Sequence, residues 1–356
     1  MKSYLFLSFF SFVFISSTAV GQFTVTGKVV DSSSREPLQG ASVFCQNTTS
    51  GTITNKEGEF SLQLKSGGYE LIVSFTGYQT REIRISSADN NPLQIAMAKE
   101  EKSMGEVVIR TSNEVKDGWD KYGKFFLENF IGSTPNAALC TLQNPEAVHF
   151  YYYKKSDKLK VLATEPIMIA NKALGYIIRY QLDSFMYYYK TKISAYRGYS
   201  LFSQMEGSFQ DQKLWSDNRK RAYFGSQLHF LRSYYDSSLK ESNFEIAMLD
   251  ETNDTKFNVI QNPYDTTYYV VYDSTFESEV FYPRKISITY KKKPEPEYLQ
   301  KFKLPKNVPV EISYIDLNDG IVIKENGYFY DQKDWVNQGY WSWKNLADLL
   351  PYDYIP

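Results

Sequence analysis

The sequence predicts a β-rich, α+β protein with two domains. The first is a seven-stranded β-sandwich, and the second is a larger, mainly antiparallel β domain with two or three helices. Short segments in which apolar and polar residues alternate recur along the chain, separated by Gly, Asn and Asp turns. Tyr (30) and Phe (24) are abundant, which favours strands. The length, about 335 residues after a leader, exceeds what one hydrophobic core usually holds.

Residues 1–21 are predicted to be a signal peptide. Lys2 supplies a positive charge, Leu5 to Ile15 is almost unbroken apolar sequence, and Ala19-Val20-Gly21 offers small residues for cleavage before Gln22. The apolar run is too short to span a bilayer comfortably, so a retained anchor helix is the less favoured alternative. No cysteine lies at the cleavage site, which argues against a lipid anchor. We expect no transmembrane span after the signal is removed.

Residues 22–97 are predicted to form the sandwich. In Gly40 to Cys45, Ala41, Val43 and Cys45 alternate with other side chains, which indicates a strand with one buried face. Asn55 to Gly58 is a turn before the next alternating run. Further strands are expected at Phe23–Val30, Phe60–Leu64, Tyr69–Phe75, Glu82–Ile85 and Leu93–Met97.

Five motifs in this region resemble the carboxypeptidase regulatory-like domain. They are Gly27 to Asp31, Pro37 to Val43, Gly51 to Asn55, Gly58 to Phe60 and Phe75 to Tyr78. The resemblance implies a transthyretin-like β-sandwich, common at the N-terminus of Bacteroidota envelope proteins, including TonB-dependent transporters. It implies an accessory fold and no catalysis. Asn55 stands where the family often has Asp, and both residues suit a turn.

Residues 98–116 are predicted to be a linker, and residues 117–356 a domain that resembles only uncharacterised Bacteroidota proteins. Within the linker, Glu106 to Arg110 is β-prone; an edge strand is favoured over a contact with an energy-transducing partner. Apolar spacing predicts a helix from Trp119 to Ile131 and a second one over residues 211–240, interrupted near Gly225. Asn318-Asp319-Gly320 is predicted to be a hairpin turn.

Few residue types for catalysis or metal binding are present. His149 and His229 are far apart and belong to no H-E-x-x-H pattern, and no G-x-S-x-G or phosphate-binding loop occurs. We therefore expect no metal, no cofactor and no catalytic residues. Cys45 is expected in a core and Cys140 against the first helix, more as a buried thiol than as a nucleophile. In an oxidising compartment the two can also pair as a disulfide.

Two tyrosine runs are the remaining candidates for a binding surface. Tyr151 to Tyr153 and Tyr187 to Tyr189 place side chains on both faces of a strand. Tyr152 and Tyr188 are the predicted ligand-facing aromatics. The alternative, favoured by the ordinary behaviour of Tyr in sheets, is packing against cross-strand neighbours.

Together these features predict an exported, non-enzymatic envelope protein. It would lie in the periplasm or at the outer membrane rather than be fully secreted, and would bind an envelope protein or a glycan or act as a scaffold. A net charge of −1 argues against nucleic acid as a partner. The alternative is a polysaccharide hydrolase with a carboxylate pair in the second domain.

Overall fold

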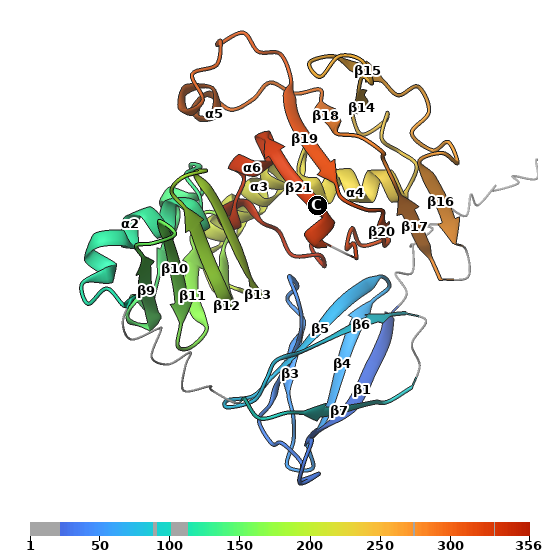
Figure 1. Cartoon of the computed structure of the whole chain (residues 1–356). Coiled ribbons are helices and arrows are strands. Elements are labelled where there is room, and N and C mark those ends of the chain that lie inside the picture. The colour runs from blue at the N-terminus through green and yellow to red at the C-terminus, as the bar shows by residue number, and fades with distance from the viewer. Residues whose placement is uncertain (1–21, 88–90, 101–112, 273–274, 331) are drawn as a thin grey trace, which may run out of the picture.

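The computed structural model describes residues 22–87, 91–100, 113–272, 275–330 and 332–356. The predicted signal peptide and most of the predicted linker lie outside these residues. Three β-rich bodies pack around a central C-terminal segment (Figure 1). No helix in the described part of the chain is both long enough and apolar enough to cross a bilayer.

The first domain is a β-sandwich of two sheets, as predicted. The sheets have the strand orders β4-β1-β7 and β3-β2-β5-β6. Every pairing in it is antiparallel except that of β1 with β7, which is parallel. The strands are β1 (Gln22–Asp31), β2 (Ser42–Cys45), β3 (Gly51–Ile53), β4 (Glu59–Lys65), β5 (Gly68–Ser74), β6 (Arg81–Ser86) and β7 (Leu93–Met97).

Alternation along the strands builds the core of this domain. In β4, Phe60, Leu62 and Leu64 are buried while the residues between them are exposed. Gly58, at the turn before β4, has a φ of +75°, and a Cβ there would lie 2.5 Å from the carbonyl oxygen of Val29. Only glycine meets both conditions, which explains why this turn carries it.

The second domain begins with a sheet covered by helix α2 (Gly118–Phe130). The strand order is β8-β11-β12-β10-β9, with β13 paired to β12, and all pairings are antiparallel. Phe126 and Phe130 of α2 are fully buried against this sheet. The strands are β8 (Cys140–Leu142), β9 (Val148–Tyr153), β10 (Lys158–Ala163), β11 (Ile167–Asn171), β12 (Tyr176–Tyr188) and β13 (Ile193–Gln204).

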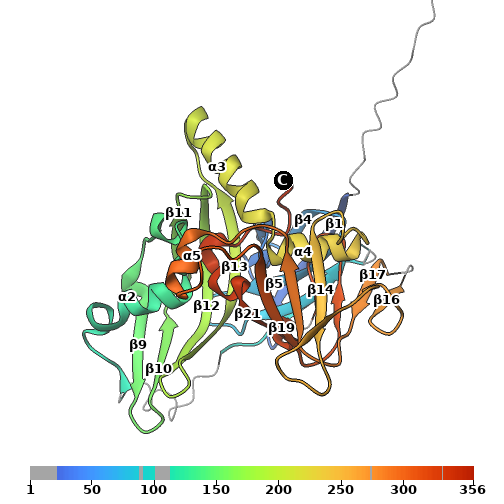
Figure 2. The same cartoon turned by 90° about the horizontal axis from the view of Figure 1, so that it is seen from above.

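Two helices, α3 (Phe209–Tyr223) and α4 (Gln227–Tyr235), link this sheet to the next one. They occupy the region predicted as a helix with an interruption near Gly225, and the chain breaks there because Gly225 has a φ of +89°. Ser208 caps α3 in a reciprocal bond pair with Asp211, and the Ser226 hydroxyl caps α4. Figure 2 shows α3 projecting away from the sheets.

The last part holds two further antiparallel sheets, with the strand orders β15-β14-β18-β19-β21 and β16-β17-β20. Asn318 to Gly320 joins β19 to β20, which lie in different sheets, so the predicted hairpin is wrong. With α5 and α6, the domain has more helices than the two or three predicted. The elements are β14 (Phe244–Leu249), β15 (Phe257–Val259), β16 (Tyr269–Tyr272), β17 (Glu277–Val280), β18 (Ile286–Tyr290), α5 (Pro296–Lys301), β19 (Glu311–Leu317), β20 (Ile321–Ile323), β21 (Trp335–Gly339) and α6 (Tyr340–Trp343).

The C-terminal segment, residues 344–356, contacts all three bodies. Its Tyr352 amide donates to the Asn47 carbonyl of the first domain (2.8 Å), and its Ala347 amide donates to the Ile131 carbonyl (3.0 Å). Arg232 of α4 fixes it from the third side, donating to the carbonyl oxygens of Tyr352 and Tyr354 (both 2.9 Å). The aromatic C-terminal end thus packs against the rest of the protein.

Candidate functional site

A cavity of about 520 Å³ lies where the two halves of the second domain meet the first domain. This volume falls in the range of small-molecule sites, roughly 300–1,000 Å³. Its wall takes residues from the loop after β2, from β12 and β13, from the α3–α4 junction, from β19 and β21, and from the C-terminal segment. The site exists only in the folded protein, because no single stretch of sequence supplies it.

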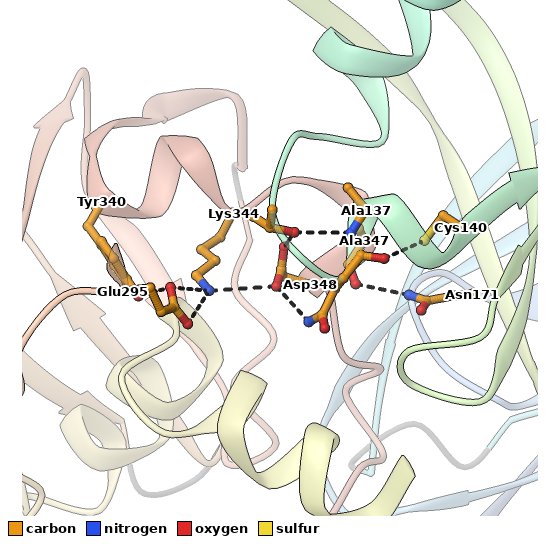
Figure 3. Close-up of polar contacts among 10 residues, drawn as sticks. Ala137, Cys140, Asn171, Glu295, Tyr340, Lys344, Ala347 and Asp348 are labelled. Atoms are coloured by element: carbon orange, nitrogen blue, oxygen red, sulfur yellow. Dashed lines mark hydrogen bonds and ion pairs between the residues drawn. The ribbon is translucent and has the colours of Figure 1, made fainter. Parts of the chain in front are cut away.

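A row of charged side chains runs along one wall (Figure 3). The Tyr340 hydroxyl donates to Glu295 Oε2 at 2.5 Å, and Lys344 Nζ lies 3.0 Å from Glu295 Oε1 and 2.9 Å from Oε2. Tyr340 and Lys344 stand one helical turn apart at α6, so both face the same carboxylate. Glu295 precedes α5 as its N-cap residue without a capping bond from its side chain, which leaves the carboxylate for this contact.

Asp348 ends the row and ties it to the first half of the domain. Its carboxylate accepts from Thr134 Oγ1 (2.7 Å) and Asn136 Nδ2 (2.8 Å), and Lys344 Nζ lies 3.6 Å away. Burial raises the pKa of Asp348, while Lys344 and these hydrogen bonds oppose the rise. The row therefore bridges both halves of the second domain across the cavity wall.

Glu311 is the buried carboxyl of the site. It is the first residue of β19 and only 3% exposed. Burial raises the pKa of Glu311 to about 8, although the positive charges of Lys292 and Lys344 lower it. Its carboxyl lies beside the Tyr340 hydroxyl, whose single proton is given to Glu295. A protonated Glu311 can use the lone pair that remains on this hydroxyl.

Amides and aromatic rings form the rest of the wall. Trp335 Nε1 donates to Asn337 Oδ1 (2.7 Å), and Asn337 Nδ2 donates to Gln227 Oε1 (3.0 Å). Trp341 Nε1 donates to the Gly225 carbonyl (2.8 Å). Aromatic faces with fixed amide groups suit the recognition of molecules rich in hydroxyl groups, and the two carboxyls add the means of moving a proton.

The two tyrosines proposed from the sequence lie outside this cavity. In the ladder β9-β10-β12, Tyr152 pairs with Leu159, and Leu159 pairs with Tyr187, whereas Tyr188 pairs with Lys158. Tyr152 and Tyr188 therefore point to opposite faces of the sheet. Tyr152 packs at the α2 side and its hydroxyl donates to Asp157 Oδ1 (2.7 Å), while Tyr188 is 39% exposed. The prediction that Tyr152 and Tyr188 face a ligand stays untested, but their positions on opposite faces of the sheet do not favour one shared binding surface.

Both cysteines are free thiols, so the structure contains no disulfide between Cys45 and Cys140. Cys45 lies in the core of the first domain and Cys140 against the core of the second. Burial raises the pKa of the Cys140 thiol to about 12 and that of Cys45 further. Cys140 Sγ interacts with the Asn136 carbonyl oxygen (3.4 Å), not with a histidine.

The histidines have structural partners. His149 Nδ1 lies 3.0 Å from Glu114, and His229 Nδ1 accepts from the Gly225 amide at 3.2 Å. Burial lowers the pKa of His229 to about 4, so the ring is neutral at pH 7. In the part of the chain that the structure describes, no three His, Cys, Asp or Glu residues are grouped as metal ligands would be.

Sequence reasoning missed Glu295, Glu311 and Lys344. A signal for Glu311 was present, because Glu311, Ser313 and Ile315 alternate as the buried positions of β19. A charged residue at an inward-facing position of a strand is uncommon unless it is paired or faces a cavity. No comparable signal marks Glu295 or Lys344, which lie in loops and meet only in three dimensions.

Comparison with known proteins identifies the first domain. The family model described as CarboxypepD_reg-like domain matches residues 25–109. These residues belong to that family. This chain is 33% identical over 104 residues to the TonB-dependent receptor SusC of Bacteroides thetaiotaomicron, covering 29% of this chain and 10% of the receptor. It is 32% identical over 113 residues to the TonB-dependent receptor P39 of Formosa agariphila, covering 31% of this chain and 11% of that receptor.

This chain therefore matches only about a tenth of the length of these two receptors, through its CarboxypepD_reg-like domain. Among solved structures, a type II cohesin–X-dockerin complex from Acetivibrio cellulolyticus aligns with 23% of this chain and 62% of that one at 26% identity, with a TM-score of 0.20. A membrane-associated protein of unknown function from Bacteroides fragilis aligns with 45% of this chain and 65% of that one at 14% identity, with a TM-score of 0.19. We draw nothing about function from alignments with such scores.

Proposed function

We propose that this chain is a cell-envelope protein that binds a glycan fragment in the cavity of its second domain, with the CarboxypepD_reg-like domain as its scaffold. The observation that carries the proposal is the cavity wall, which combines indole and phenol rings with amide and hydroxyl groups. Such walls bind neutral polar ligands, because rings cover the apolar faces of a sugar while amides bond its hydroxyl groups.

The scaffold role rests on the contact between the two domains. The Asn47 amide donates to the Ser200 carbonyl (2.7 Å), and the Phe202 amide donates to the Thr48 carbonyl (2.8 Å), which holds the loop after β2 against β13. Phe44 and Ile72 pack on Tyr199 beside this contact. Since Asn47 also lines the cavity, the first domain forms part of the site wall.

The envelope location is supported by two observations. Residues 1–21 have the charge and apolar pattern of a signal peptide. The CarboxypepD_reg-like domain is shared with TonB-dependent receptors. We place the protein in the periplasm or at the outer membrane.

Isothermal titration of the purified chain with neutral oligosaccharides of two to four sugars tests the binding proposal. We expect saturable binding of at least one oligosaccharide and a loss of about tenfold or more in Asn337→Ala, since one lost polar contact costs about 1–2 kcal/mol. The matched control is Gln338→Ala, the next residue of β21, which bonds Lys285 and Asp316 instead. Absence of binding to the whole set, or equal loss in both variants, would contradict the proposal.

The hydrolase alternative also gains a specific observation. Two glutamates, Glu295 and Glu311, line the wall of the same cavity. Glycosidic bond hydrolysis requires two carboxyl groups that flank the scissile bond, so this alternative predicts that a sugar fits between Glu295 and Glu311.

A further inference from the structure

Strand β16 forms a free edge of the small sheet β16-β17-β20. It pairs only with β17 in the part of the chain that the structure describes, and Figure 1 places it at the outer margin of the molecule. We propose that β16 pairs with β16 of a second copy of this chain, so that the two small sheets join across a twofold axis. The residues of β16 do not line the cavity, so this pairing is independent of glycan binding.

Several other sheet edges of the protein are covered or charged. The edge of β9 is covered where the Val115 amide donates to the Phe150 carbonyl (2.9 Å). The edge of β13 is covered where the Phe202 amide donates to the Thr48 carbonyl (2.8 Å). The edge strand β6 carries two arginines and a glutamate. Such features prevent neighbouring molecules from pairing with an edge, whereas β16 (Tyr269–Tyr272) contains neither a charged residue nor a proline.

The backbone of β16 directs one amide and one carbonyl at the free edge. The Phe281 amide donates to the Tyr268 carbonyl (3.0 Å), and hydrogen-bonded pairs alternate along antiparallel strands. By this alternation, the N–H and C=O groups of Val271 point away from β17. The Tyr269 amide points the same way and donates to the Asp265 carbonyl (3.0 Å), which closes that end of the edge. Val271 therefore offers a donor and an acceptor to a further strand.

The side chains of β16 are apolar or aromatic and face solvent. Residues Val270 to Tyr272 are between 41% and 52% exposed. The two glutamates of β17 beside them have partners of their own: Glu277 lies 2.9 Å from Lys324 Nζ, and Glu279 accepts from the Tyr272 hydroxyl (2.7 Å). Neither glutamate therefore presents an unpaired charge that would repel a second copy.

Antiparallel pairing centred on Val271 makes this strand complementary to itself. The Val271 amide of each copy would donate to the Val271 carbonyl of the other, which is the reciprocal arrangement that a twofold axis requires. On both sides of this central pair, Val270 of one copy would lie opposite Tyr272 of the other. Pairs of a β-branched and an aromatic residue stabilise sheets. The strand thus fits a second copy of itself in charge, in hydrogen bonding and in side-chain size.

Sedimentation velocity over a series of concentrations tests the pairing in the chain without residues 1–21. We expect a monomer–dimer equilibrium with a Kd on the order of 10–100 µM, because the contact of one short strand is at the weak end of protein interfaces. Val271→Lys should weaken the dimer by about tenfold or more, since it places two like charges at the twofold axis. Val271→Thr keeps a β-branched residue and should keep the dimer.

The matched control is Val259→Lys. Val259 is 48% exposed and lies on β15, the edge strand of another sheet, so this variant should dimerise like wild type. Both valines are exposed, and thermal melts of both lysine variants should match wild type. A short bis-maleimide should link Val271→Cys into a covalent dimer and should not link Val259→Cys, with wild type as the control for the native cysteines.

Three results would overturn the pairing. The first is a wild type that sediments as a monomer at every concentration, which would leave the edge to a strand of another protein. The second is a dimer that persists in Val271→Lys or that is linked equally through both cysteine variants. The third is growth into larger aggregates in place of a dimer, because a twofold contact is closed and ends at two copies.

Discussion

Two buried carboxyl groups, one in each domain, have opposite environments. Asp31, at the end of β1, is 4% exposed and accepts hydrogen bonds from the Ser33 amide (2.7 Å), the Ser34 amide (2.8 Å) and the Tyr78 hydroxyl (2.8 Å). These bonds lower the pKa of Asp31 to about 2. Glu311 is equally buried, but burial dominates there and raises its pKa to about 8.

The difference separates a structural carboxylate from a candidate for function. Asp31 is surrounded by donors that the fold provides, so its charge holds a turn in place. Glu311 lies on a cavity wall beside a hydroxyl whose proton goes elsewhere, so its hydrogen-bonding capacity is left for a proton or a ligand. Burial alone does not distinguish the two; the supply of donors does.

The largest expected effect concerns the pH dependence of stability at Glu311. The folded pKa of about 8 lies above the ordinary value of 4.5, so the folded state binds more protons and loses stability as pH rises between these values. The loss is about 5 kcal/mol for a shift of this size. Glu311→Gln should remove it and be more stable than wild type at pH 9. Urea unfolding at pH 5, 7 and 9 measures this, and parallel curves for the two proteins would contradict it.

Arg232 resembles Asp31 in that the fold supplies hydrogen-bond partners for its charge. Its substitution tests whether such a charge contributes to the stability of the folded protein. Besides the Tyr352 and Tyr354 carbonyls, it donates to the Asn326 carbonyl (3.0 Å). Arg232→Ala leaves three carbonyls without their donor and should lower the free energy of unfolding by about 3 kcal/mol. Chemical denaturation measures the change. Arg221→Ala, on an exposed site of α3 where the side chain donates to Asn218, is the control and should change little.

Asp31 itself should show the opposite sign to Glu311. Because its folded pKa is lowered from 3.8 to about 2, its contribution is present above pH 4 and disappears as pH falls through 2. Asp31→Asn should therefore melt at a lower temperature than wild type at pH 7, and the gap should close near pH 2. Calorimetric scans at both pH values measure it. If the difference in melting temperature between the two proteins did not change with pH, the charge of Asp31 would not be what stabilises this turn.

The smallest expected effect is at the contact between the domains. Asn326 Nδ2 donates to the Gly68 carbonyl (3.0 Å), and its Oδ1 accepts from the Gly68 amide (3.4 Å). Asn326→Ala should cost about 1 kcal/mol. It should do so without changing ligand affinity, since Asn326 is not on the cavity wall. Asn318→Ala, in an exposed turn, should be neutral in the same denaturation assay.

The first domain could be predicted from sequence because local rules determine it. Alternation along β1, β4 and β5, and glycines at turns such as Gly58, act over a few residues and also define the CarboxypepD_reg-like motif. The predicted helix ending near Ile131 and the break at Gly225 were found for the same reason. The pairing of β1 with β7 and that of β19 with β21 join strands that are distant in the sequence, and they were not predicted.

The candidate site could not be predicted, because its residues have no sequence spacing in common. Arg232, for example, donates to three carbonyl groups that are distant from it in the sequence. Tyr152 and Tyr188 were predicted from the runs of tyrosine in the sequence, and they lie outside the cavity. Composition reports how many rings or charges a chain has, whereas the position of Glu311 beside Tyr340 depends on how β19 and α6 pack.

The parallel pair β1–β7 has a consequence for how the first domain is assembled. β1 is the central strand of its sheet, so the sheet is completed only when the two ends of the domain sequence meet, Gly27 opposite Leu93. Contacts between such distant residues slow folding, because a long loop must close before they gain any free energy. Until β7 has been synthesised, β1 therefore lacks its partner on one side, and the sheet cannot be completed.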